Sequence, residues 1–126
     1  MKKILIIDDD VDIIDLVTNR LERNNYEVIF SNDSDNGVKK ALEQKPDLII
    51  IDVMMPRLPG PEAVKLLKSY EGTQNIPILF FTAMNSYLPP NTEFDDINVG
   101  GQFFPSIPKP FDPNRLLSCV RLLLGE

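Results

Sequence analysis

The stretch LIIID, residues 48–52, places a carboxylate directly after a run of branched apolar residues. A second run, ILII at residues 4–7, is followed by three aspartates at residues 8–10. Such continuous apolar runs are typical of strands buried on both faces of a parallel sheet. Because ligands bind beyond the carboxyl ends of these strands, we expect Asp8, Asp9 and Asp52 to lie close together. Crowded carboxylates favour a hard cation such as Mg²⁺, so the sequence predicts an acidic, metal-dependent phosphoryl site.

Apolar runs alternate with segments of helical period along the whole chain, which indicates an α/β fold with helices on both faces of a parallel sheet. Five strands are predicted, near residues 3–8, 27–31, 48–52, 76–82 and 102–107. Four helices are predicted, from Val11 to Leu21 with Asp10 or Asp12 as N-cap, from near Ser34 to before Pro46, from Gly60 to Tyr70, and from Asp112 to Gly125. Between Ala83 and Gly101, Pro89-Pro90 forbids a continuous helix, so we expect only a short or irregular helix after Asn91.

Composition narrows the class of protein. A chain of 126 residues with 43% hydrophobic content is long enough for one domain with a single core. The net charge of −6 and the absence of a basic stripe argue against direct nucleic-acid binding and against binding to anionic membranes. No apolar segment approaches transmembrane length, and the run after Lys2-Lys3 is too short for a signal peptide. One cysteine and no histidine exclude an internal disulfide and the usual zinc sites, so we expect a cytoplasmic protein.

Asp52 is the candidate nucleophile. An aspartate carboxylate can attack a phosphoryl group and form a mixed anhydride, provided that positive charge offsets the charge on both groups. Mg²⁺ on Asp9 and Asp52, with a water on Asp8, would supply this charge from one side. Lys109, just past the last predicted strand, would supply an ammonium from the other side, and Thr82 would donate its hydroxyl to a phosphoryl oxygen. The ends of four strands therefore deliver the parts of one site.

These motifs resemble the receiver domain of bacterial two-component response regulators. The matching segments are IIDDD at residues 6–10, DVMMP at 52–56 with Gly60 beyond it, Thr82-Ala83, and KPF at 109–111. All of them occur in the same order and at compatible separations, and the resemblance covers residues 1–126 as one receiver domain. It implies a flavodoxin-like, doubly wound sheet of five parallel strands in the order 2-1-3-4-5.

The resemblance also implies a function for the chain. It implies that Asp52 accepts a phosphoryl group from the phosphohistidine of a sensor histidine kinase or phosphotransfer protein, which makes the chain a signalling switch. Asp9 and Asp52 would bind Mg²⁺ directly, Asp8 would act largely through water, and the backbone carbonyl of Met54 would complete the protein ligands. Such a domain is no enzyme beyond its own Mg²⁺-dependent phosphorylation and dephosphorylation.

The resemblance implies that Thr82 and Lys109 hold the phosphoryl oxygens. Their movement would report phosphorylation to the surface of the fourth helix, fifth strand and last helix, which addresses a downstream protein or an output domain of a longer chain. Ser106 stands where the family commonly has an aromatic residue, three positions before the lysine. Phe103 and Phe104 lie nearby, but neighbouring side chains of a strand point to opposite faces, so they are not automatic substitutes. We therefore expect intact phosphorylation chemistry with a different readout.

Three other functions compete with this hypothesis. A haloacid-dehalogenase-type phosphatase also uses paired aspartates, spaced as Asp8 and Asp10 are, but Asp12 stands where its pattern expects Thr or Val, and it needs a larger chain. A flavodoxin-like FMN carrier needs a phosphate cradle where this chain is acidic. An interaction module that keeps the receiver fold but works without phosphorylation finds support in Ser106, and it predicts that Asp52→Asn leaves binding of its target unchanged.

Overall fold

The computed structural model describes residues 1–83, 96–109 and 111–126. The strands are β1 Lys3–Ile7, β2 Glu27–Ser31, β3 Leu48–Asp52, β4 Ile78–Ala83, β5 Ile97–Val99, β6 Gln102–Phe104 and β7 Ser106–Lys109. The helices are α1 Val11–Glu22, α2 Ser34–Gln44, α3 Gly60–Ser69 and α4 Pro113–Leu123.

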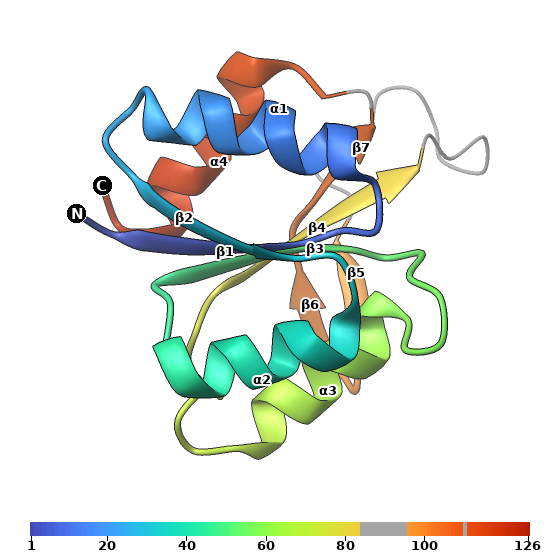
Figure 1. The fold of residues 1–126 in the computed structure, drawn as a ribbon. Coiled ribbons are helices and arrows are strands. Elements are labelled where there is room, and N and C mark those ends of the chain that lie inside the picture. The colour runs from blue at the N-terminus through green and yellow to red at the C-terminus, as the bar shows by residue number, and fades with distance from the viewer. Residues whose placement is uncertain (84–95, 110) are drawn as a thin grey trace.

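One parallel sheet forms the centre of the molecule. Its strands lie in the order β2-β1-β3-β4-β7, and every neighbouring pair is parallel. Figure 1 shows α1 and α4 on one face of this sheet and α2 and α3 on the other. This is the predicted doubly wound, flavodoxin-like fold, with β7 as the fifth strand of the 2-1-3-4-5 order.

The central strands are buried on both faces. Residues 4–7 of β1 and 48–51 of β3 are 0% exposed. Alternate side chains enter two separate clusters, so that Ile4 and Ile6 pack on the side of α1 and α4, while Leu5 and Ile7 pack on the side of α2 and α3. This double burial is the reason that both strands are continuous apolar runs rather than alternating ones.

The segment after β4 differs from the prediction. The helix predicted after Asn91 begins in residues 84–95, which lie outside the described residues. The residues that follow form an antiparallel hairpin, β5–β6, whose turn contains Gly100 and Gly101 at φ 61° and 90°. Two-residue turns with positive φ match the twist of a hairpin, and glycine adopts them without strain. Val99 and Phe104 anchor the hairpin in the cluster beneath α2 and α3.

The prediction of a single strand over residues 102–107 was wrong. The chain divides at Pro105 into β6, which pairs with β5, and β7, which pairs with β4. Proline has no backbone N–H to donate to a continuous ladder, although the Pro105 carbonyl accepts a bond from the Phe80 N–H at 2.9 Å. Strand β7 runs on to Lys109 and therefore carries that lysine to the carboxyl edge of the sheet.

Candidate functional site

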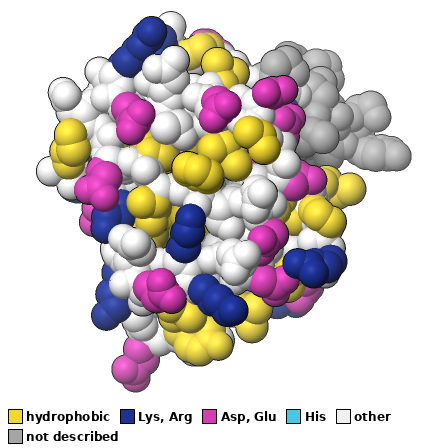
Figure 2. Space-filling model, in the orientation of Figure 1, with side chains coloured by type: hydrophobic (Ala, Val, Ile, Leu, Met, Phe, Trp, Pro, Cys, Tyr) yellow, Lys and Arg dark blue, Asp and Glu magenta, His cyan; other side chains and the backbone are white. Residues whose placement is uncertain are grey.

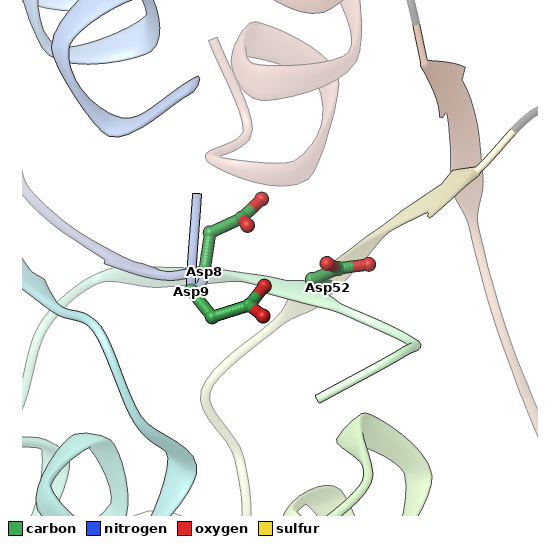
Figure 3. A group of neighbouring side chains, drawn as sticks. All are labelled: Asp8, Asp9 and Asp52. Atoms are coloured by element: carbon green, nitrogen blue, oxygen red, sulfur yellow. The ribbon is translucent and has the colours of Figure 1, made fainter. Parts of the chain in front are cut away.

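Three aspartates meet at the carboxyl edge of the sheet. Asp52 is the last residue of β3, and Asp8 follows Ile7, whose register partner in β3 is Ile51. Oxygens of Asp8, Asp9 and Asp52 all lie within 4.8 Å of one another. Figure 3 shows the three carboxylates gathered at the ends of these two neighbouring strands. Asp8 is 0% exposed and Asp52 is 6% exposed, whereas Asp9 faces solvent.

Lys109 joins this cluster from a distant part of the chain. Its Nζ lies 2.7 Å from Asp8 Oδ2 and 3.2 Å from Asp52 Oδ2, and it donates a hydrogen bond to each. The ammonium is also 6.0 Å from the ring centre of Phe81 on the neighbouring strand β4. One partly buried cation therefore offsets part of the charge of the carboxylates.

Backbone N–H groups hold the other oxygens of the two buried aspartates. Asp8 Oδ1 accepts from the Asp10 N–H at 3.0 Å, and Asp52 Oδ1 accepts from the Met54 N–H at 3.2 Å. The Asp10 carboxylate caps α1 by accepting from the N–H groups of Asp12 and Ile13, so it is committed to the helix. These bonds orient Asp8 and Asp52 toward the edge of the sheet.

Gly60 lies tightly against the backbone of Asp52. A Cβ at this position would overlap the Asp52 carbonyl oxygen, and the Gly60 N–H donates to the Val53 carbonyl at 3.0 Å. Sequence reasoning identified Gly60 as a motif residue and helix start but missed this close approach. The signal was a glycine opening a helix directly before a proline, where a side-chain cap is more usual.

Burial and charge shift the ionisation of the cluster. Burial raises the pKa of Asp8, and the Asp52 charge adds to the rise, while the hydrogen bonds from Lys109 and Asp10 oppose it. Burial lowers the pKa of Lys109, but hydrogen bonds and charge from Asp8 and Asp52 outweigh it and raise that pKa overall. Burial is thus the main cause of the raised Asp8 pKa, whereas two carboxylates beside one ammonium raise the pKa of Lys109. Lys109 consequently stays protonated, and the cluster keeps a deficit of positive charge.

Two other predicted site residues, Thr82 and Met54, lie at the same edge. Thr82 follows Phe81, the register partner of Asp52, and pairs with Pro108, but it makes none of the hydrogen bonds described above. The Met54 side chain is 72% exposed, and its contribution to the site here is the backbone N–H that donates to Asp52. Ser106 is 3% exposed in β7 opposite Phe80.

The donor set fits a hard divalent cation. It offers only oxygen, from Asp8, Asp9 and Asp52, and its buried ammonium leaves negative charge uncompensated. Asp9 faces solvent, where water ligands could remain on the ion. The Met54 carbonyl as a further ligand stays a prediction.

Comparison with known proteins identifies the family. The model of the response regulator receiver domain matches residues 4–121, and the chain belongs to this family. It is a receiver domain of two-component response regulators, consistent with phosphorylation-dependent signalling. It is 37% identical over 126 residues to the alkaline phosphatase synthesis transcriptional regulatory protein PhoP of Bacillus subtilis, an alignment that covers 98% of this chain and 48% of PhoP. The chain thus spans about half the length of the curated relatives that it matches.

Solved structures agree with this assignment. The chemotaxis protein CheY4 of Vibrio cholerae is 29% identical and superposes with a TM-score of 0.82, with 98% of each chain covered. The receiver domain of a Pseudomonas aeruginosa sensor histidine kinase shares the fold with a TM-score of 0.81 at 22% identity, over 99% of this chain and 98% of that one. That structure has a magnesium ion coordinated in its active-site cleft. None of the helices in the described part of this chain has the length and apolar character that a bilayer-spanning helix requires.

Proposed function

We propose that Asp52 accepts a phosphoryl group from the phosphohistidine of a histidine kinase or phosphotransfer protein. The observation that carries this proposal is the Lys109 ammonium, 3.2 Å from Asp52 Oδ2 and 2.7 Å from Asp8 Oδ2, at the edge where Asp9 also converges. A carboxylate nucleophile beside a fixed cation and further carboxylates is suited to phosphoryl transfer.

The transfer follows from this geometry. An Asp52 carboxylate oxygen attacks phosphorus, the new P–O bond forms as the P–N bond to the donor imidazole breaks, and the imidazole nitrogen leaves with the bonding electron pair. Lys109 stays beside the transferred group and offsets charge on its oxygens. The Met54 N–H holds Asp52 Oδ1, which orients the carboxylate for attack. Thr82, at the same edge, would donate its hydroxyl to a phosphoryl oxygen.

Mg²⁺ is the cofactor that this site would take. Asp8, Asp9 and Asp52 would hold the ion, with the Met54 carbonyl as a further ligand. When bound, it supplies positive charge on the side of the phosphoryl group that Lys109 does not cover. The magnesium ion in the related receiver domain supports this assignment.

The phosphodonor would dock on α1. This helix begins directly after the acidic cluster, and its Val11 and Leu16 are each 58% exposed. Leu16 also lines a groove of about 130 Å³ with Phe111 and Pro113. A helix that carries a phosphohistidine could cover this apolar surface while its imidazole reaches Asp52.

A phosphorylation assay tests the acceptor. Purified protein is incubated with acetyl phosphate, with Mg²⁺ or with chelator, and its intact mass is measured for wild type, Asp52→Asn and the control Asp96→Asn. We expect one Mg²⁺-dependent phosphoryl adduct in wild type and in the control, and none in Asp52→Asn. Absence of an adduct even with an authentic kinase would favour the phosphorylation-independent interaction module.

A second assay tests the docking surface. We expect Leu16→Arg to slow transfer from a phosphorylated kinase while leaving phosphorylation by acetyl phosphate unchanged. Leu122→Arg is the matched control, because Leu122 is a 70% exposed leucine on α4. Equal slowing by both variants would contradict docking on α1.

The remaining assignments are proposals of the same kind. The domain would act in the cytoplasm, catalyse only its own phosphorylation and dephosphorylation, and pass the signal to a downstream protein or to an output domain.

A further inference from the structure

The outer edge of β2 is an unpaired sheet edge within the described residues, since β2 is the first strand in the sheet order. The Glu27 N–H donates to the Lys2 carbonyl at 2.9 Å, and the Ser31 carbonyl accepts from the Asp8 N–H at 3.1 Å. Because backbone groups alternate in direction along a strand, Glu27, Ile29 and Ser31 face β1 and the two residues between them face outward. Val28 and Phe30 therefore present their N–H and C=O groups to the surroundings.

The side chain of Lys40, on α2, covers part of this edge. Its ammonium donates to the Phe30 carbonyl and lies 5.3 Å from the centre of the Phe30 ring. Lysine on an edge strand is a common protection against strand pairing. Yet Phe30 is 52% exposed, which is unusual for an aromatic residue in a strand. Figure 2 looks onto this edge and shows hydrophobic and basic side chains next to one another between α1 and α2.

A basic groove lies beside Phe30 on this otherwise acidic molecule. Its volume is about 390 Å³, and it is lined by Phe30, Ser31, Asn32, Asn36, Lys39, Lys40 and Glu43. Glu27 occupies the other end of the same strand; its side chain is 51% exposed and lies 3.8 Å from Lys3 Nζ on β1. This edge thus has an acidic side chain of β2 at one end and two lysines of α2 beside the other.

We propose that a second copy of this chain pairs with this edge. The two β2 strands run antiparallel across a two-fold axis, with Val28 of each copy opposite Phe30 of the other. Both outward-facing residues then lie in hydrogen-bonded pairs, and each such pair exchanges two N–H···O=C bonds. A pairing centred on Val28–Val28 or on Phe30–Phe30 would place only one such pair within the strand. The register that satisfies the edge is therefore unique, and the interface is isologous.

The side chains agree with this register. Glu27 of one copy lies opposite Ser31 of the other, next to the groove that contains Lys39 and Lys40. Lys40 exchanges the Phe30 carbonyl for the Glu27 carboxylate of the second copy, while that carbonyl accepts the Val28 N–H instead. The exposed Phe30 ring gains the cross-strand Val28 side chain as an apolar neighbour.

A second copy suits this edge better than an unrelated extended peptide. The two-fold axis brings Glu27 of each copy next to Lys39 and Lys40 of the other, so each copy provides both halves of the charge complementarity. An unrelated peptide would have to supply both its acidic group and its register independently. The interface is small, so we expect a reversible, concentration-dependent dimer.

A charge-swap experiment tests the proposal. Glu27→Lys makes both ends of the edge basic, and the double variant Lys39→Glu with Lys40→Glu makes both ends acidic. We expect each variant alone to dimerise at least about tenfold more weakly than wild type in sedimentation velocity, because like charges now oppose each other. An equimolar mixture of the two variants is expected to recover the wild-type level of association.

A control and an independent readout make the outcome specific. Glu62→Lys on α3 changes the net charge by the same amount as Glu27→Lys and should leave association unchanged, and circular dichroism checks that every variant is folded. Amide hydrogen exchange of Val28 and Phe30 should slow as the concentration of wild type rises. All proteins are measured without phosphodonor and also in an Asp52→Asn background, so the result does not depend on the proposed phosphorylation. A wild type that stays monomeric, or a mixture that fails to associate, would overturn the proposal.

Discussion

Replacement of Asp9 by asparagine is expected to stabilise the protein when no divalent ion is present. Asp9 carries a full charge within 4.8 Å of oxygens of both Asp8 and Asp52, while the single ammonium of Lys109 is bonded to the other two carboxylates. Two unit charges at this separation repel by about 1 kcal/mol at the dielectric constant of water and by about 3.5 kcal/mol at an effective constant of 20. Since Asp9 faces solvent, the lower figure applies to each repulsion.

Relief of two such repulsions should raise the free energy of unfolding by about 1–2 kcal/mol, which corresponds to a rise in Tm of at least about 4 °C. Most substitutions destabilise a protein, so the sign alone is informative. The assay is thermal unfolding in chelator, with Asp15→Asn as a control that removes the same charge from an exposed position on α1.

The same variant should behave in the opposite way with Mg²⁺. An ion at one hundred times its Kd stabilises the native state by about 2.7 kcal/mol, and loss of a ligand removes much of that gain. Wild type should therefore overtake Asp9→Asn as Mg²⁺ is added. An Asp9→Asn protein that is less stable than wild type in chelator would refute the electrostatic reasoning, because it would mean that the carboxylate stabilises the cluster.

Three further predictions concern the same cluster. Gly60→Ala should lower the free energy of unfolding by about 1–3 kcal/mol in denaturant titration, because the alanine Cβ would displace the Asp52 backbone. It should also slow phosphorylation of Asp52, as measured by intact mass. Gly72→Ala is the control and should change neither quantity, because the nearest neighbour of its Cβ would be the flexible end of Lys45, with Cε at 3.5 Å. Lys109→Met should cost about 3–5 kcal/mol in chelator and less in Mg²⁺, because it leaves buried carboxylates unpaired; an equal loss under both conditions would contradict this account. Burial raises the pKa of Asp8 above 3.8, so the native state binds this proton first and wild type should gain stability relative to Asp8→Asn as pH falls toward 3.8. Denaturant titrations of both proteins across this interval measure that gain, and a constant difference between their unfolding free energies would argue against it.

The positions of the three carboxylates could be predicted from the sequence because the sequence marks the ends of buried strands. The apolar runs at residues 4–7 and 48–51 stop where Asp8 and Asp52 begin, and parallel pairing brings equivalent ends to one edge. Lys109 followed the same logic at the end of the last strand. The sequence could not predict that a single ammonium pairs with two carboxylates, because this depends on the short distances from Lys109 Nζ to Asp8 and to Asp52.

The hairpin had a local signal that was outweighed by its surroundings. Gly100-Gly101 lies between short alternating segments, the typical pattern of a two-residue hairpin turn, but each arm has only three residues. Pro89-Pro90 favoured an irregular connection before the hairpin, and the apolar pattern of residues 102–107 predicted one strand that continued across Pro105. The hydrogen bond from Lys40 to the Phe30 carbonyl at the β2 edge had no local sequence signal, since the two residues are ten positions apart in different elements.

Phe104, two residues before Ser106, packs an aromatic ring against β4. Because side chains alternate along the strand, Phe103 is 62% exposed and Phe104 only 5% exposed. The Phe104 ring packs edge-on against Phe80, with 6.1 Å between the ring centres. The Lys68 ammonium lies 5.5 Å from the centre of the Phe104 ring and donates to the carbonyls of residues 74 and 76. Phe104 therefore ties the hairpin both to β4, two residues before Thr82, and to the end of α3. Within the described residues, an aromatic contact with β4 thus comes from the hairpin, two residues before Ser106.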